Sequence, residues 1–312
     1  MLKRALFTLA LSGLIAGCSR APKTEVKPVP QAQVWGSEGT APGEFRGPRA
    51  IVAAKDGYVY VADRASHISK WTKDGKYIME WTAPVVSNGR FEGPEGITDL
   101  PNGDLAVTNT HASRVLIYDS QGKLKSQFGS YGTGKGQFLL VTGITTDKDG
   151  FIYLADYGGE FDRISKYTRD GKQVANWPGH GEGKRQFRRP CGLAIDNKGD
   201  LLVADIGNHR IQILDRKTGA YKGQFGPRGR KDGELTYPYG VAVDGKGFIY
   251  TVEYSNHRVQ KWSPDYKWVA SWGSVGRKPG QLQNPWGLSV DKDGTVYIAD
   301  TNNNRVQKFH FG

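Results

Sequence analysis

Residues 190–215 read PCGLAIDNKGDLLVADIGNHRIQILD, and this stretch decides the fold. It contains three short runs of aliphatic residues, and the pair Lys198-Gly199 separates the first run from the second. Tight hairpins need residues that accept a positive φ, which glycine does without steric cost. The stretch therefore predicts antiparallel strands at residues 190–196, 200–205 and 210–215, and a fourth strand follows at residues 221–225.

The same pattern occurs six times in the chain. An aromatic residue ends each predicted fourth strand, and these residues recur every 46 to 49 positions. A proline or a valine follows thirteen positions later, and an acidic residue or Asn follows after fifteen more. Constant spacing at such a period predicts a repeat architecture. The aromatic positions are Trp35, Trp81, Phe128, Trp177, Phe225 and Trp272; the proline positions are Pro48, Pro94, Val141, Pro190, Pro238 and Pro285; the acidic positions are Asp63, Asn109, Asp156, Asp205, Glu253 and Asp300.

The two ends of the repeated region predict how the copies assemble. Residues 58–62 and 151–155 are apolar on both alternating faces, as expected for strands packed between two neighbouring sheets. The sixth copy stops after its third strand, whereas residues 31–36 match a fourth strand that has no strands before it. Pairing the two segments removes exposed edges. We therefore expect an all-β, six-bladed β-propeller of four-stranded antiparallel blades over residues 31–312, closed by its N-terminal strand.

The first residues predict export. A basic start with Lys3 and Arg4 precedes an apolar run at residues 5–14, which is too short to span a membrane. The following Ile-Ala-Gly-Cys at residues 15–18 resembles the lipobox of bacterial lipoproteins, and this resemblance implies acylation of Cys18. We expect a signal peptide at residues 1–17, a proline-containing tether at 18–30, and a membrane-anchored lipoprotein. In a host with two membranes it would sit in the outer membrane, facing the periplasm or the cell surface. The alternative is an ordinary signal peptide with a chance cysteine.

Three motifs resemble the NHL repeat. The first is Pro-x-Gly-(Ile/Val/Leu), as in residues 238–241. The second is Tyr-(Val/Ile)-Ala-Asp, as in residues 297–300, and the third is Asn-His-Arg-(Ile/Val)-Gln, as in residues 256–260. The resemblance covers about residues 31–312 and implies a propeller. Similar propellers serve as RNA-binding domains, sensor ectodomains, amidating lyases and lactonase-like enzymes, so the fold does not choose a function.

A candidate binding ring lies directly after the proline positions. In such a blade the first strand begins at the central channel, so these side chains should surround its mouth. All six differ, although the positions on either side repeat closely. The alternative is that they face a loop and are unconstrained. The candidates are Arg49, Glu95, Thr142, Cys191, Tyr239 and Trp286.

Neither a metal site nor a catalytic group is predicted. The amidating lyases that the repeat resembles place zinc-binding histidines directly after this proline, and none of the six residues here is His. His209 and His257 stand in a repeated Asn-His-Arg context and are expected to be architectural. Cys191 has no neighbouring ring histidine to act as a base, and Glu95 alone does not make a calcium site. We expect no cofactor.

Basic residues are concentrated in part of the chain. The formal net charge is +12, which suits an anionic partner. Loops that lead into the first strands are basic in copies three to six and nearly balanced in copies one and two, so one sector of one face should be electropositive. A solvated basic surface is the alternative. The candidate residues are Arg188, Arg189, Arg228 and Arg230.

These observations favour a monomeric binding or scaffolding module for a protein, a peptide or an anionic envelope polymer. The alternatives are a metal-dependent lyase or hydrolase and a nucleic-acid-binding domain. The predicted export makes nucleic-acid binding less attractive. The acidic positions and the arginines five residues later, such as Asp205 and Arg210, are expected to form a structural ion pair in each blade.

Overall fold

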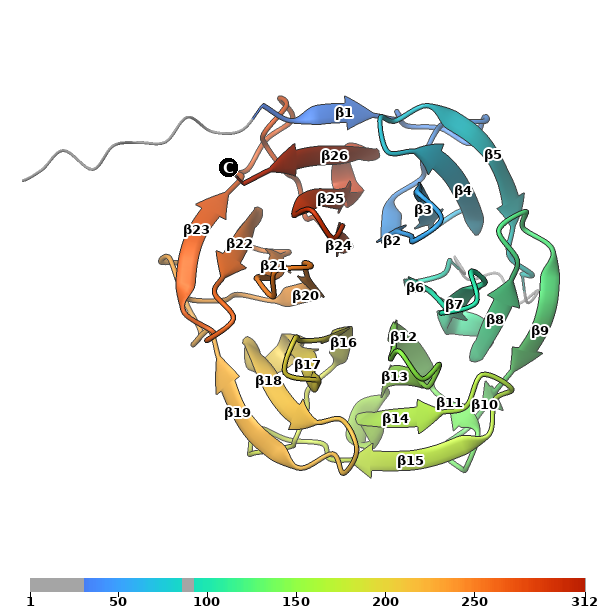
Figure 1. Ribbon diagram of the computed structural model, residues 1–312, viewed down its shortest axis with the longest axis vertical. Helices are drawn as coiled ribbons and strands as arrows, with labels where there is room; N and C mark the ends of the chain where they lie inside the picture. The colour runs from blue at the N-terminus through green and yellow to red at the C-terminus, as the bar shows by residue number, and fades with distance from the viewer. Residues whose placement is uncertain (1–30, 86–92, 312) are drawn as a thin grey trace, which may run out of the picture.

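Six four-stranded antiparallel sheets stand around a central channel in the computed structural model, which describes residues 31–85 and 93–311 (Figure 1). The first strand of each sheet lines the channel and the fourth forms the rim (Figure 1). This confirms the predicted all-β, six-bladed propeller. The predicted signal peptide, Cys18 and the tether lie outside the described residues. Within the described residues, no helix is long and apolar enough to cross a membrane.

The blades are numbered one to six in chain order, and blade six contains both ends of the described chain. They consist of β2 (Pro48–Ala53), β3 (Tyr58–Asp63), β4 (His67–Thr72) and β5 (Tyr77–Thr82); β6 (Gly96–Asp99), β7 (Leu105–Asn109), β8 (Arg114–Tyr118) and β9 (Leu124–Phe128); β12 (Leu140–Thr146), β13 (Ile152–Tyr157), β14 (Arg163–Tyr167) and β15 (Gln173–Pro178); β16 (Pro190–Ile195), β17 (Asp200–Asp205), β18 (Arg210–Asp215) and β19 (Tyr221–Phe225); β20 (Pro238–Val243), β21 (Ile249–Glu253), β22 (Arg258–Trp262) and β23 (Trp268–Trp272); and β24 (Leu288–Val290), β25 (Thr295–Asp300), β26 (Arg305–His310) and β1 (Gln33–Trp35).

Short elements join some of the strands. The 3₁₀ turns follow second strands, and a small parallel ladder lies in the loop that leads into blade three. They are η1 (Thr110–Ala112), η2 (Gly159–Phe161), η3 (Ile206–Asn208), η4 (Thr301–Asn303), β10 (Ser130–Tyr131) and β11 (Gln137–Phe138).

The ring closes as the sequence predicts. β1 pairs antiparallel with β26, with Val34 opposite Gln307 and Trp35 opposite Val306. Trp35 is buried between blades six and one, where its ring lies 6.5 Å from that of Trp71. Blade six thereby gains its outer strand from the other end of the chain.

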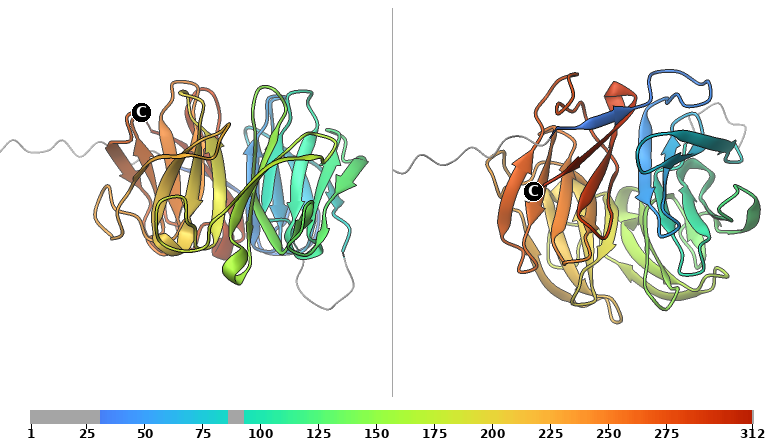
Figure 2. Two further views of the ribbon diagram at one scale, coloured as in Figure 1. Left: turned by 90° about the horizontal axis from the view of Figure 1, so that it is seen from below. Right: turned by 45° about the horizontal axis from the view of Figure 1, so that its top comes forward.

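The two ends of the channel differ in what they carry. One end, which we call the mouth face, carries the starts of the first strands and the loops between second and third strands. The other end, the turn face, carries the hairpins that follow the first strands; the two faces are the opposite edges of the ring in side view (Figure 2). The hairpins are held by Asp side chains: Asp196 Oδ1 accepts hydrogen bonds from the backbone N–H groups of Lys198 and Asp200, each at 2.9 Å. These aspartates are therefore structural and lie away from the mouth.

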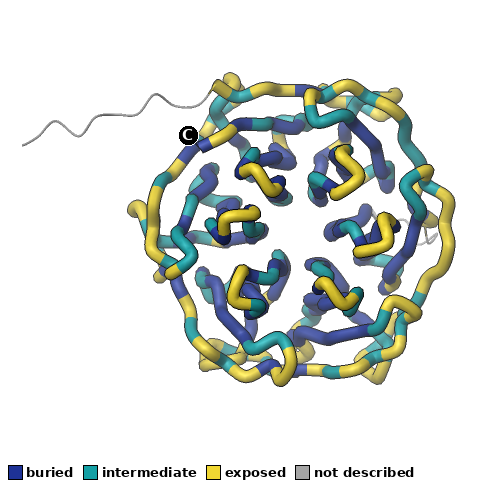
Figure 3. Tube along the Cα trace, in the orientation of Figure 1, coloured by how far each residue is buried: buried dark blue, intermediate teal, exposed yellow. Residues whose placement is uncertain are grey.

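Burial follows the radial order of the strands. The inner strands and the strands next to them are buried between blades, whereas the outer strands and the turns are the exposed parts (Figure 3). Inner strands approach so closely that five of the six blades carry a glycine two residues after the proline position, whereas blade one carries Ala50. A Cβ atom on Gly192 would lie 2.7 Å from the carbonyl oxygen of Tyr239 in the next blade. The glycine thus sets the narrow spacing that brings the neighbouring ring residues together.

Candidate functional site

The mouth is positioned by hydrogen bonds that repeat from blade to blade. In blade four, Asp205 Oδ1 accepts from the backbone N–H of Arg188 at 2.8 Å, and Oδ2 accepts from Arg210 Nε at 2.9 Å. Arg210 also donates to the carbonyl oxygens of Gly183 and Gln186. Both lie in the loop that leads into the first strand of blade four, and we call such a loop an incoming loop. Glu253 with Arg258 and Asp300 with Arg305 repeat the ion pair at 2.7 and 2.8 Å. The prediction of a structural pair is confirmed for these blades.

A second repeated contact joins neighbouring blades. The Nδ1 atom of His209 accepts from the backbone N–H of Tyr237 at 3.1 Å, and that of His257 accepts from Asn284 at 3.0 Å. Each of these donors precedes the proline position of the next blade. Burial lowers the pKa of both histidines, which keeps the acceptor nitrogen unprotonated. The architectural interpretation of His209 and His257 is therefore confirmed.

The predicted ring residues converge on one cavity of about 400 Å³ that runs along the channel. Five of them line it, namely Arg49, Glu95, Cys191, Tyr239 and Trp286. The sixth, Thr142, is fully buried, and its hydroxyl donates to the carbonyl oxygen of Pro190 at 3.2 Å. Thr142 therefore joins blades three and four and does not face the cavity.

Arg49 organises one side of the mouth. Its guanidinium forms an ion pair with Glu95 and lies over the ring of Trp286, with Cζ 4.6 Å from the ring centroid. Burial raises the pKa of Glu95, and the nearby Arg49 opposes that shift. Three buried atoms here have no hydrogen-bond partner among the described residues: Arg49 Nε, Glu95 Oε2 and Trp286 Nε1. Buried polar atoms are normally paired, so these two donors and one acceptor are an exception that marks this side of the mouth.

Aromatic side chains form the other side. The rings of Tyr239 and Trp286 lie 4.2 Å apart, and Tyr254 packs 5.1 Å from Tyr239. Burial raises the pKa of Tyr239 to about 12, so it is a neutral donor at physiological pH. The aromatic group gives the mouth a flat, half-buried wall beside the charged pair.

Cys191 is packed into this wall. Its side chain is buried with Ile206 and Tyr239. Burial, reinforced by the negative charge of Glu95, raises the pKa of the thiol to about 12. A thiol that is protonated at neutral pH is a poor nucleophile and a poor metal ligand. The structure thus agrees with its interpretation as a small apolar filler.

The four candidate arginines are in different settings. Arg189 lies over the ring of Tyr157 at 5.2 Å and reaches the mouth, whereas Arg188 pairs with Glu182 at 2.9 Å on the outer surface. Arg228 and Arg230 are exposed on the loop that leads into blade five. Only Arg189 therefore belongs to the channel mouth, and the other three belong to the surrounding loops.

One part of the mouth was missed by the sequence analysis. The residue directly after each acidic position forms a second ring, and it includes Arg64, Tyr157 and Tyr254. The residue type at this position varies between copies, with Thr and Tyr each occurring twice, which is a weaker form of the signal that identified the first ring. Among the described residues, no three His, Cys, Asp or Glu side chains lie close enough together to hold a metal ion.

The segments that carry the repeated contacts match a known family of sequence repeats. The family model described as "NHL repeat" matches residues 187–214, 235–262 and 282–309. Each match begins near the end of the loop before a first strand and ends in a third strand, so it covers the acidic residue and the arginine that pairs with it. The chain therefore carries NHL repeats in a six-bladed β-propeller.

Known proteins share parts of this NHL-repeat propeller. RING finger protein nhl-1 of Caenorhabditis elegans is 33% identical over 79 residues, which are 25% of this chain and 8% of that protein. The chain thus spans a small part of this relative.

Among solved structures, virginiamycin B lyase from Staphylococcus aureus matches with a TM-score of 0.64 and 16% identity, over 90% of this chain and 99% of that one. A putative gluconolactonase matches at 0.65 and 18%, over 90% and 92%. A Bacteroides thetaiotaomicron protein of unknown function matches at 0.70 and 14%, over 90% and 75%. At these identities the structures support the fold alone.

Proposed function

We propose that this NHL-repeat propeller is an exported, lipid-anchored binding module that takes an anionic or peptide ligand at its channel mouth. The observation that carries the proposal is the convergence of Arg49, Glu95, Tyr239 and Trp286 on one cavity, with buried polar atoms left unpaired. Small-ligand sites are concave and combine apolar walls with a few polar groups, and this mouth combines the rings of Tyr239 and Trp286 with the Arg49–Glu95 pair.

The charge at the mouth supports an anionic ligand. Arg49, Arg64 and Arg189 all lie close enough to oppose the raised pKa of Glu95. Arg49 pairs with Glu95 directly, and Arg64 and Arg189 add positive charge nearby in a buried setting, where electrostatic attraction is stronger than at an open surface. The exposed Arg228 and Arg230 add positive charge on the loops, which would assist the approach of an anionic partner.

The direction of β1 supports a consistent orientation on a membrane. Gln31 lies beside Thr295 and His310 at the turn face, and the strand runs from there toward the mouth face. The described chain therefore enters the propeller at its turn face, and the proposal places this face, and not the mouth, toward the anchoring membrane.

Two probes test ligand binding: poly-L-glutamate as an anionic peptide and polygalacturonate as an anionic polysaccharide. Reversal of four arginines to Glu should weaken binding strongly and reduce its salt dependence. The matched control reverses four lysines on the turn face and changes the net charge equally. The arginines are Arg188, Arg189, Arg228 and Arg230, and the lysines are Lys148, Lys217, Lys246 and Lys292. Equal losses in the two variants, or no loss in the first, would contradict the site assignment.

The anchor is tested separately. Cys18→Ser should move the protein from the membrane fraction to the soluble fraction of its host cells. Cys191→Ser is the matched control and should leave the protein on the membrane. Continued membrane retention of the Cys18 variant would remove the lipid anchor from the proposal without affecting the ligand site.

A metal-dependent lyase or hydrolase is the competing proposal. At the mouth the chain offers Glu95, whose free oxygen faces a region crowded with arginines, and Cys191, whose thiol is protonated at neutral pH. Such a setting favours anions over cations. Stoichiometric zinc or calcium in the protein purified without chelators would favour the enzyme, whereas unchanged probe binding after chelation would favour the binding module.

A further inference from the structure

Blade three has a longer loop between its second and third strands than the other blades. Six residues, 157–162, separate Asp156 from Arg163, whereas four residues separate the corresponding positions in each of the other five copies. Figure 2 shows the 3₁₀ turn of this loop, η2, as a short green coil that projects at the edge of the ring in the side view. We call residues 157–162 the blade-three projection.

The base of the projection is held by Asp162. Its Oδ2 accepts from the backbone N–H of Arg189 at 3.0 Å, which is the same link to the next blade that His209 makes from blade four. Oδ2 also contacts His180 Nδ1 at 3.1 Å, and Oδ1 accepts from the backbone N–H of Gly158 at 3.2 Å. Because the link between the blades is kept, the two additional residues extend outward into solvent and do not separate the blades.

The apex of the projection carries an exposed aromatic ring. Phe161 is 51% exposed, whereas the aromatic residues that end the fourth strands are buried or half-buried. The next residue, Asp162, is 2% exposed and is fixed by the contacts above. The ring is therefore presented on a base that is already ordered, which reduces the entropy lost when a partner binds. Exposed aromatic residues in such settings are typical of protein interfaces.

The incoming loop of blade four, to which Asp162 bonds, adds positive charge beside the projection. Arg189 of this loop lies over the ring of Tyr157, with Cζ 5.2 Å from the ring centroid. The exposed charged residues of the loop and of the projection are Lys184, Arg185, Arg188 and Arg189 on the basic side and Glu160 and Glu182 on the acidic side. Basic residues are in excess, so this surface is complementary to an acidic partner.

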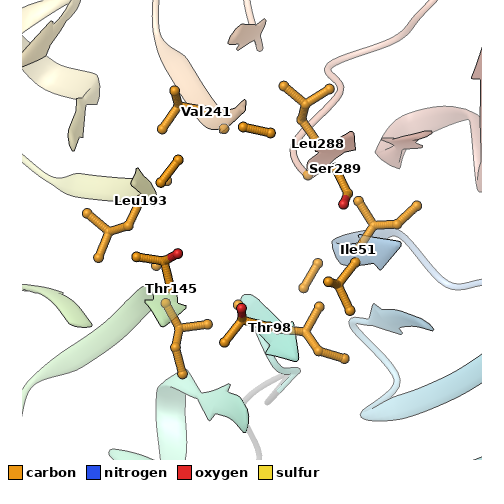
Figure 4. A pocket seen from close by; sticks show the side chains of 18 of the residues that line it. Ile51, Thr98, Thr145, Leu193, Val241, Leu288 and Ser289 are labelled. Atoms are coloured by element: carbon orange, nitrogen blue, oxygen red, sulfur yellow. The ribbon is translucent and has the colours of Figure 1, made fainter. Parts of the chain in front are cut away.

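The channel below the mouth presents hydroxyl groups to its centre. Thr98, Thr145 and Ser289 point toward the open centre, whereas Ile51 and Leu193 point between the blades (Figure 4). A partner that covers the mouth would therefore make its apolar contacts on the mouth face, where Phe161 is exposed, and not within the channel.

We propose that the blade-three projection is the anchor point for a folded acidic protein, which receives Phe161 in an apolar pocket and places a carboxylate against Arg189. A projecting side chain is buried by a partner that has a concave surface, so a folded protein fits better than an extended peptide or a polysaccharide. Carboxylates pair with arginine in a planar, two-point geometry, which suits a guanidinium that is already stacked on a ring. The inference rests on the proposed function, because it assigns a class of partner to the same mouth face.

Photo-crosslinking from the apex identifies the partner in the cells that produce the full-length protein. Phe161→p-benzoylphenylalanine keeps an aromatic ring at the apex. Val174→p-benzoylphenylalanine is the matched control, because Val174 is also 51% exposed and lies on the outer strand of the same blade. Position 161 should give one dominant protein adduct that position 174 does not give. Mass spectrometry identifies the adduct, and the sequence of the partner should be acidic.

Calorimetric titration with the purified partner then tests the contacts. Phe161→Ala should weaken binding by about thirtyfold or more, as expected for an anchor residue. Arg189→Gln should weaken it by about tenfold, because the variant keeps the backbone bond to Asp162 and removes the charge. Val174→Ala should change the affinity less than twofold. Thermal unfolding of each variant confirms that the propeller is intact.

Three results would overturn the inference: no protein adduct specific to position 161, an adduct with nucleic acid or lipid in its place, or a protein partner whose affinity is unchanged in Phe161→Ala. If one of these occurs while poly-L-glutamate still binds through the mouth-face arginines, the partner class is wrong and the binding module stands. If poly-L-glutamate fails to bind as well, the proposed function itself is wrong.

Discussion

His209 Nδ1 accepts the backbone N–H of Tyr237 and thereby connects blade four to blade five. The same position in blade six is Asn304, whose Oδ1 accepts the backbone N–H of Gly47 at 2.8 Å and connects the last blade to the first. Two different side chains therefore perform one task. Both residues have a positive φ, 56° and 51°, which Asn adopts more readily than most residues.

His209→Ala should lower the free energy of unfolding by about 1–2 kcal/mol, because it leaves the Tyr237 N–H without its acceptor and places Ala at a positive φ. His209→Asn should restore most of the loss, since Asn304 already makes this contact elsewhere in the ring. Denaturant unfolding of both variants measures the difference. Equal losses for Ala and Asn would show that the imidazole ring, and not the acceptor atom, is required.

The same contact predicts a pH dependence. Burial lowers the pKa of His209 and of His257 below the ordinary value of 6.5, and the nearby Arg228 adds to the effect at His209. The unfolded chain then binds more protons than the folded one, so this contribution to stability is complete above about pH 6.5 and is lost as the pH falls through the lowered values. Thermal unfolding between pH 7.5 and 5 should show the loss. A double variant with Asn at both positions should show a flatter profile, and an unchanged profile would exclude these histidines as its source.

Arg258 and Arg114 allow a matched comparison of the ion pair. Arg258 bonds to buried Glu253, whereas Arg114 follows Asn109 at the same spacing and, among the described residues, bonds to Gln127 at the surface. Arg258→Ala leaves a buried carboxylate unpaired and should cost about 3–5 kcal/mol, whereas Arg114→Ala should cost less than about 1 kcal/mol. Chemical denaturation measures both. Similar costs would mean that the pair contributes little to holding the incoming loop.

Ring closure depends on Trp35. Trp35→Ala should destabilise the propeller by about 3–5 kcal/mol, because the side chain is 8% exposed and packs between blades six and one. Val34→Ala, one residue away on the 37% exposed face, should change stability by less than about 0.5 kcal/mol. If both variants unfold at the same temperature as the wild type, the ring does not depend on the packing of this strand.

Cys191 should resist alkylation. Burial raises the pKa of its thiol to about 12, so iodoacetamide at pH 8 should react slowly with the native protein and rapidly after denaturation. Mass spectrometry counts the modified thiols. Fast labelling of Cys191 in the native state would show that the mouth opens far enough to expose it.

The blades were predictable because their signals lie within one repeat. The spacing from aromatic residue to proline to acidic residue fixed the strands, so the bounds predicted for blade four agree with β16 to β19 within one residue. The unpaired segment at residues 31–36 predicted the closure. A recurring apolar residue ten positions after the aromatic one, such as Phe187 and Leu235, is buried in each described incoming loop that contains it and was available as a further signal.

Contacts between blades were not predictable in the same way. Thr142 has the position of a ring residue, but its partner is the carbonyl oxygen of Pro190 in another copy, and no pattern within a repeat shows that contact. The pairing of Arg49 with Glu95 and its stacking on Trp286 involve three different copies. Such geometry depends on how closely the blades approach, which the sequence pattern does not specify.

Blade six contains both ends of the described chain, so it can be completed only late in synthesis. β1 is synthesised first, but its only strand partner, β26, is among the last residues to be made. Five blades can form as the chain emerges, while the opening segment must stay extended and unpaired until synthesis is nearly complete. A shortened chain that lacks β26 would leave β25 with an open edge and β1 without a strand partner. Such products should be recognised readily by quality-control proteases, so the fold itself distinguishes finished chains from unfinished ones.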